Sequence, residues 1–170
     1  KMQQKKKIIN EKGIGDEIRG GGSATVYRIN DSNLAIKVSP LDGFFRPWPN
    51  PSPDETYRGL YREFMIQSQL YERDISVPKP EGLTWVKSPK TGIFCPSLVM
   101  EYIPHTNPYQ NPEYPRIEKM FWDEVKKAKE AGFTPSFDCG PYNNWLFNPE
   151  RDKVYFIDVR FWGKENDTKK

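Results

Sequence analysis

The sequence is poor in cysteine and histidine and contains no long hydrophobic run. Its cysteines, Cys95 and Cys139, and its single histidine, His105, do not have the spacing of a metal site. No apolar stretch reaches the roughly 18 residues of a membrane helix, and none is typical of a secretory signal. These absences exclude a zinc site built on the cysteines and predict a cytoplasmic protein with free thiols and no membrane partner.

The sequence also lacks an excess of charge of one sign. Its 26 basic and 23 acidic side chains leave a net charge of +3, which does not indicate a strongly nucleic-acid-binding domain. The basic excess lies mainly in residues 1–7, KMQQKKK, and a weak contact of this segment with RNA or an anionic surface stays open as an alternative. A chain of 170 residues is long enough for one domain with a hydrophobic core.

Turn-rich and apolar stretches alternate along the chain in an order that predicts the fold class. Alternating residues predict three antiparallel strands within 12–39, two strands within 77–103 and a hairpin within 144–158. An S-x-x-E capping box at 52–55 predicts the start of one helix, and periodic apolar residues predict a second helix over 117–131. We therefore expect an α+β fold, in which an antiparallel five-stranded sheet with one helix precedes a small helical part.

The first half of the chain contains candidates for phosphate binding. Lys37 lies in the middle of the strand LAIKV, where a buried charge would need a partner, and Glu63 of the first helix is a candidate. The alternative is a lysine that reaches solvent. Gly20, Gly21 and Gly22 offer backbone N–H groups that can approach phosphate oxygens closely, although glycine-rich turns are also common in plain hairpins.

The second half contains the segment FDCGPYNNWLFNPERDKVYFID, with Asp138, Asn143 and Asp158. Carboxylate and amide oxygens are ligands suited to Mg²⁺. Asn143 and Asp158 flank a short hairpin, whose ends come together, and Asp138 precedes them on a loop where it can accept a proton from a hydroxyl. The structural alternative is that aspartate and asparagine simply favour turns.

Several motifs occur in a single order along the chain: GGGSATVY, AIK, YREFMIQSQL, VMEYI, DCGPYN and FIDV. In this order they resemble the protein kinase superfamily, in a reduced atypical form similar to RIO-type kinases. The resemblance implies a protein kinase-like fold with a severely truncated helical C-lobe. It divides the chain into a basic tail at 1–11, an N-lobe at 12–103 and a minimal C-lobe at 104–170.

The resemblance also implies the residues of an ATP site. Lys37 would contact the α- and β-phosphates and pair with Glu63. Asp138 would be the catalytic base, and Asn143 and Asp158 would hold Mg²⁺. The implied cofactors are ATP and Mg²⁺. The residues assigned to ATP binding are Gly20, Gly21, Gly22, Val26, Ala35, Lys37, Glu63, Met100, Glu101 and Ile103.

The chain departs from the family pattern at several positions. Ser136 stands where the family has the histidine of HRD, and Val159 and Arg160 replace the phenylalanine and glycine of DFG. The loss of that glycine predicts that Asp158 is held in one orientation. The sequence ends soon after Asp158 and leaves no room for an activation segment, so a substrate would be recruited in another way.

Two classes of function follow from these observations. The first is an ATP- and Mg²⁺-dependent phosphotransferase, with a serine or threonine of a protein as the substrate that the resemblance implies and a small-molecule hydroxyl as the alternative. The second is a pseudokinase that binds a nucleotide or a protein partner. Tryptophans such as Trp48, Trp122 and Trp162 would then be exposed contacts, but we favour the alternative that they close the core where the absent helices would pack. For the first function, Lys37→Met is expected to weaken ATP binding and leave the fold intact.

Overall fold

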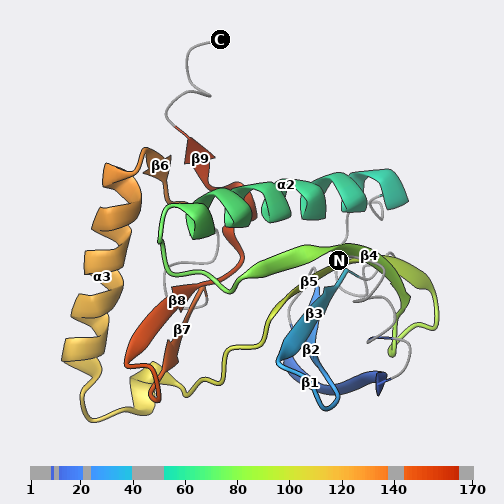
Figure 1. Ribbon diagram of the computed structural model, residues 1–170, viewed down its shortest axis with the longest axis horizontal. Coiled ribbons are helices and arrows are strands. Elements are labelled where there is room, and N and C mark those ends of the chain that lie inside the picture. Colours follow the sequence, from blue (N-terminus) through green and yellow to red (C-terminus); the bar gives the residue numbers. More distant parts are fainter. Residues whose placement is uncertain (1–8, 10–11, 21–23, 40–51, 138–143, 165–170) are drawn as a thin grey trace, which may run out of the picture. The chain divides into compact units, whose positions relative to one another are not determined.

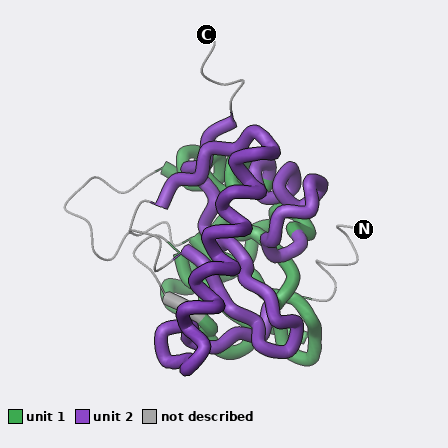
Figure 2. Tube along the Cα trace, turned by 90° about the vertical axis from the view of Figure 1, so that its left-hand side faces the viewer, with its two compact units in different colours: residues 1–64, 80–102 green, residues 65–79, 103–170 purple. Residues whose placement is uncertain are grey.

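The computed structural model describes residues 9, 12–20, 24–39, 52–137 and 144–164. The chain forms two compact units, and we describe each by itself (Figure 2). Unit 1 consists of residues 1–64 and 80–102, and unit 2 of residues 65–79 and 103–170. Both helices and strands are present, so the predicted α+β class is confirmed.

Unit 1 contains the predicted antiparallel sheet, whose five strands lie in the order β1-β2-β3-β5-β4 (Figure 1). Strands β4 and β5 form a hairpin, and β5 is the strand of this hairpin that pairs with β3. Strand β3 therefore lies in the middle of the sheet. All residues of β3 are buried as a result. The strands are β1 (Ile14–Gly20), β2 (Thr25–Ile29), β3 (Leu34–Val38), β4 (Pro80–Lys87) and β5 (Phe94–Glu101).

The two faces of this sheet have different roles. On one face, Ile36 lies opposite Tyr27 of β2 and Val99 of β5, within an apolar cluster that forms the core of the sheet. Because side chains alternate along a strand, Lys37 lies on the opposite face. The members of the apolar cluster are Ile9, Tyr27, Ile29, Leu34, Ile36, Val38, Val86, Cys95 and Val99.

Helix α2 (Pro53–Glu72) begins at the predicted capping box. The backbone N–H of Glu55 donates to Ser52 Oγ over 3.2 Å, and the backbone N–H of Ser52 donates to Glu55 Oε2 over 2.8 Å. The helix ends in a Schellman motif, in which the N–H of Ile75 donates to the carbonyl of Leu70 and Asp74 adopts a left-handed conformation with φ of 57°. Both ends of α2 are therefore fixed by local sequence.

Unit 2 contains helix α3 (Tyr114–Glu130) and short pieces of sheet. The helix begins earlier than the predicted start at residue 117, because Pro115 is tolerated in a first turn, where the backbone N–H has no intrahelical partner. Within the described residues, no helix combines the length and the apolar character needed to cross a membrane. The remaining elements are η1 (Pro108–Gln110), β6 (Phe133–Thr134), β7 (Trp145–Asn148), β8 (Lys153–Phe156), η3 (Val159–Phe161) and β9 (Gly163–Lys164).

The core of unit 2 is aromatic. Phe121 of α3 lies 4.9 Å from Trp145 of β7, and Phe156 of β8 lies 4.9 Å from Trp162, between ring centroids. Trp162 is buried, so it belongs to the core and is not an exposed contact, whereas Trp122 is half exposed. Trp48 lies outside the described residues.

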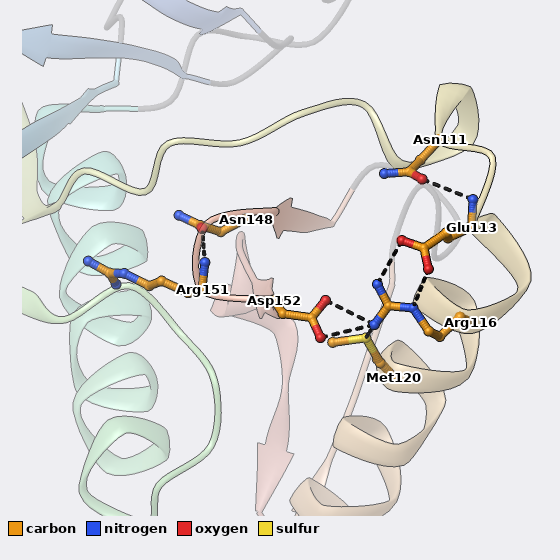
Figure 3. A network of polar contacts seen from close by, with 7 residues as sticks. All are labelled: Asn111, Glu113, Arg116, Met120, Asn148, Arg151 and Asp152. Atoms are coloured by element: carbon orange, nitrogen blue, oxygen red, sulfur yellow. Dashed lines mark hydrogen bonds and ion pairs between the residues drawn. The ribbon is translucent and has the colours of Figure 1, made fainter.

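The hairpin of β7 and β8 confirms the predicted strand pair, and its turn is tied to the start of α3 (Figure 3). Asn148 Oδ1 accepts a hydrogen bond from the backbone N–H of Arg151 over 2.7 Å and closes the turn. The guanidinium of Arg116 contacts Glu113 over 3.1 Å and Asp152 over 2.9 Å. The hydrogen bond to Glu113, followed by the one to Asp152, raises the pKa of Arg116.

We expect Ser52→Ala to lower the free energy of unfolding by about 1 kcal/mol, because the first turn of α2 loses its side-chain acceptor. Urea denaturation followed by circular dichroism measures this change. Ser52→Asn is the matched control, since asparagine caps helices as well as serine does and should preserve stability. Equal losses in both variants would show that the cap does not stabilise the helix.

The same cap predicts a pH dependence. The backbone and side-chain hydrogen bonds of Ser52 lower the pKa of Glu55 from its usual 4.5. Because the folded-state pKa lies below the unfolded one, the stabilisation is present above pH 4.5 and is lost as the pH falls through the folded-state value. The difference in stability between the native chain and Glu55→Gln should therefore shrink on acidification.

Candidate functional site

The candidate site in unit 1 is centred on a buried ion pair. Lys37 Nζ donates to both carboxylate oxygens of Glu63, over 2.8 and 2.9 Å. Lys37 is 9% exposed and Glu63 is 2% exposed. The predicted pairing is confirmed, and the alternative of a lysine that reaches solvent is wrong.

The sheet places four of the predicted ATP-binding residues on one face. Val26 of β2 lies directly opposite Lys37, and Ala35 lies directly opposite Met100 of β5. Residues directly opposite each other in an antiparallel pair share a face, as do Ala35 and Lys37, which are two positions apart. Val26 is half buried, and the other three are buried.

Glu63 faces this site because it belongs to the buried stripe of α2. Leu60, Glu63, Gln67 and Leu70 are all buried and follow one another at intervals of three or four residues. Leu60 and Leu70 are apolar, and the amide of Gln67 donates to the carbonyl of Pro78 over 2.6 Å. The apolar periodicity in the sequence therefore also orients the carboxylate.

Burial makes the ion pair costly to break, but the pair contributes little to the net stability of the fold. Transfer of two charges from water carries a desolvation penalty that their attraction offsets only in good geometry. Well-packed apolar residues in the same place are often as stable or more stable. A buried pair of lysine and glutamate is therefore better explained by the binding of a ligand than by stabilisation of the fold.

The end of β5 holds the segment for which the resemblance implies adenine recognition. Glu101 pairs with Leu34, and the backbone N–H of Tyr102 donates to the carbonyl of Asn33 over 2.8 Å. Ile103, the first residue after this part of unit 1, is buried. The backbone here is well fixed, and its role in nucleotide recognition stays a prediction.

In unit 2, the predicted convergence of the hairpin ends is present. The backbone N–H of Ile157 donates to the carbonyl of Asn144 over 2.9 Å, which closes the open end of the hairpin next to Asp158. The N–H of Phe156 donates to the carbonyl of Ser76 over 2.8 Å and anchors the strand. The hairpin thus ends one residue short of each predicted metal ligand, Asn143 and Asp158.

Asp158 has an unusual backbone conformation. Its φ of 58° and ψ of 47° lie in the left-handed region, which residues other than glycine seldom adopt. The other described non-glycine residues with positive φ are Asp31 and Asp152 in hairpin turns and Asp74 at the end of α2. Asp158 lies in neither context: it begins the 3₁₀ turn η3, and strained positions of this kind cluster at functional sites.

Residues after Asp158 hold this turn in place, and the single orientation of the Asp158 side chain stays a prediction. Val159 is buried, and its carbonyl accepts a hydrogen bond from the N–H of Trp162 over 3.0 Å. The guanidinium of Arg160 lies 4.5 Å from the ring centroid of Phe161. The sequence did not reveal this turn, since neither its apolar nor its polar residues follow a helical or strand period.

Several predicted site residues lie outside the described part of the chain: Gly21, Gly22, Asp138 and Asn143. Gly20 ends β1 and pairs with Thr25, so the glycine run connects two paired strands. The described residues contain no group of three or more histidine, cysteine, aspartate or glutamate side chains that could hold a metal ion. The predicted magnesium ligands are an amide and a carboxylate, so they would not form such a group.

No protein-family model matches the chain, and no curated protein matches it in sequence. The assignment of a function therefore depends on the residues and on their geometry within each unit.

We expect Lys37→Met to lower the free energy of unfolding by about 3–5 kcal/mol, because it leaves the carboxylate of Glu63 buried without its cation. This replaces the expectation from sequence that the variant leaves the fold intact. Urea denaturation measures the change. In the double variant Lys37→Met, Glu63→Met no charge remains, so most of the loss should be recovered. Simple addition of the two single effects would contradict a coupled pair.

We expect Asp158→Ala to be less stable than Asp158→Asn by about 1 kcal/mol, because asparagine tolerates the left-handed conformation and alanine does not. Thermal unfolding of the two variants measures the difference. Asp158→Gly is the control for the backbone, since glycine adopts this φ without a steric cost. If alanine is as stable as asparagine here, Asp158 does not require the left-handed conformation.

Proposed function

We propose that the chain is an ATP- and Mg²⁺-dependent phosphotransferase of a reduced protein kinase-like fold. The buried ion pair between Lys37 and Glu63 carries this proposal. In protein kinases, a lysine of the third strand pairs with a glutamate of the following helix, and this pair must be in place for phosphoryl transfer. The same two residue types occupy the same kinds of element in unit 1.

The chemistry of the pair supports a phosphate ligand. The ammonium group of lysine is a compact positive charge, suited to phosphate oxygens. Glu63 would hold the Lys37 side chain in one orientation before the ligand arrives, so that little side-chain entropy is lost on binding. Lys37 would then contact the α- and β-phosphates of ATP.

The apolar residues beside Lys37 support a nucleotide base. Val26, Ala35 and Met100 share its face of the sheet and offer an apolar surface with no charged group among them. Ligand sites in proteins combine such apolar surface with a few placed polar groups. Val26 and Ala35 would contact the adenine, and the backbone from Glu101 to Ile103 would read its polar edge.

The residues around the hairpin of unit 2 fit a magnesium ion. Asp158, whose backbone is left-handed, would supply a carboxylate, and Asn143 would supply an amide oxygen. Bound there, Mg²⁺ would neutralise the charge of the phosphate groups. Asp138 would accept the proton of the attacking hydroxyl, and the products would be a phosphoester and ADP. A serine or threonine of a protein is the proposed acceptor, and a small-molecule hydroxyl is the alternative.

The test is ADP production from Mg·ATP by the purified chain, beside Asp138→Ala and Asp158→Asn. We expect Asp138→Ala to reduce turnover by about 10²-fold or more, because it removes the proposed base. Asp158→Asn should raise the concentration of Mg²⁺ needed for turnover, since an amide binds the ion more weakly than a carboxylate does. Asparagine is chosen at this position because it preserves the left-handed backbone.

Asp152→Asn is the matched control, because Asp152 also has a positive φ, of 46°, but lies in an exposed hairpin turn paired with Arg116. Its turnover should equal that of the native chain. Turnover whose rate and Mg²⁺ dependence neither site substitution changes would come from a contaminant and would refute the proposal. Binding of Mg·ATP without any turnover would instead identify a pseudokinase.

A further inference from the structure

Unit 1 exposes a row of stacked aromatic rings. Tyr57 and Tyr61 of α2 and Trp85 of β4 are 38%, 49% and 46% exposed. The rings of Tyr57 and Trp85 are almost parallel, with centroids 6.2 Å apart and planes 9° apart. The ring of Tyr61 continues the row, 6.4 Å from Tyr57 with planes 24° apart. These separations are typical of offset stacking, which leaves part of each ring face open.

The row is a surface feature and not part of a core. None of its rings belongs to the apolar clusters of the two units. Phe94, the most exposed large apolar residue of the described chain, stands directly opposite Lys87, two residues from Trp85 on the same face of β4. Apolar side chains gathered on a surface in this way mark a binding site.

The cations around this row make no ion pair within the described residues, and only Arg58 lies near enough to a carboxylate to add to the hydrogen bonds of Ser52 in lowering the pKa of Glu55. Arg58 and Arg62 follow Tyr57 and Tyr61 on the exposed side of α2, and Lys87 follows Trp85 on β4. The structure gives none of these cations an ion pair or a hydrogen bond to a described residue. Elsewhere in unit 1, by contrast, Lys37 is paired with Glu63 and Lys90 with Glu17.

The nearby carboxylates offset the charge of this surface only at Arg58, which interacts with Glu55. Asp54 and Glu55 lie one turn before Arg58, in the first turn of α2. Glu55 is held by the backbone and side chain of Ser52 as part of the helix cap. The exposed rings are therefore accompanied by positive charge that Glu55 offsets at Arg58 but not at Arg62 or Lys87. Such a surface is complementary to a polyanion that also carries flat aromatic groups.

We propose that this aromatic row binds single-stranded nucleic acid. Bases would stack on Trp85 and Tyr61, and Arg58, Arg62 and Lys87 would contact the phosphates. Stacking of bases on aromatic side chains beside a positive surface is the common mode of single-strand binding and is largely independent of sequence. Trp85 lies on the same face of the sheet as Lys37, because Pro96 opposite Trp85 and Leu98 opposite Lys37 are two positions apart on β5. The row nevertheless shares no residue with the proposed nucleotide site.

The net charge of +3 does not predict this binding; the local arrangement of charge and rings does. A proteinaceous polyanion would meet the same cations but would make no use of the exposed ring faces. A duplex would present its bases only in stacked pairs, so it would also leave the rings unused. These differences define the experiment.

Fluorescence anisotropy of a labelled uridine dodecamer with the full-length chain tests the proposal. We expect saturable binding that Trp85→Ala and Tyr61→Ala each weaken by about fivefold or more, the effect of losing one stacked base. Arg62→Gln should lower the slope of log affinity against log salt by about one, the effect of losing one phosphate contact. Trp122→Ala is the matched control, since Trp122 is 50% exposed but belongs to unit 2, and it should bind as the native chain does.

Further variants show whether a loss of binding comes from lost ring stacking, from altered folding or from the basic residues 1–7. Trp85→Phe retains an aromatic ring, so it should recover most of the affinity that Trp85→Ala loses. If phenylalanine binds as weakly as alanine, the loss does not come from stacking, and the proposal fails. It also fails if Lys5→Gln, Lys6→Gln, Lys7→Gln abolishes binding while Trp85→Ala does not.

Competition and self-association experiments test whether the row binds a different ligand. A thymidine dodecamer should compete with the labelled uridine strand, because the rings contact bases and not the 2′-hydroxyl. Complete displacement by polyglutamate at equal charge would identify an acidic protein as the ligand and overturn the proposal. Dimerisation of the native chain that Trp85→Ala abolishes, seen by sedimentation without nucleic acid, would assign the row to a second copy of the chain and overturn it as well.

Discussion

The structure of unit 1 depends on the ion pair that Lys37, in the buried central strand β3, forms with Glu63. β3 lies in the middle of the sheet and is buried on both faces, so Lys37 cannot reach water as an exposed lysine would. Glu63 must then lie on the buried stripe of α2 and within hydrogen-bond distance. The capping box at the start of α2 and the Schellman motif at its end fix the helix that carries this carboxylate.

Unit 2 meets a different constraint, the closure of a short hairpin around an aromatic core. Phe156 and Trp162 pack against each other on either side of Asp158, and backbone hydrogen bonds hold the strand that leads to it. Between these two core residues, Asp158 adopts a left-handed conformation. The tightly packed surroundings supply the energy that such a backbone requires.

Charge in unit 1 is distributed in two ways that suit two ligands. The buried cation, Lys37, is paired and pre-oriented, as binding of one nucleotide in a defined pose requires. The exposed cations beside Tyr57, Tyr61 and Trp85 make no ion pair within the described residues, which suits a flexible polyanion that is held by many weak contacts. The proposed nucleotide site would use the first distribution, and the proposed nucleic-acid site would use the second.

The sequence by itself determined the local elements: the alternation of the strands, the cap at Ser52, the stripe of α2 and the hairpin near Asn144. These depend on neighbours a few residues away, so their patterns are readable in one dimension. Only the tertiary structure decided that Lys37 is enclosed, that Trp162 is core, and that Asp158 is left-handed. It also placed Tyr57 and Trp85 in one row. Burial and stacking depend on residues that are far apart in the chain, and contacts between such residues leave no periodic pattern in the sequence.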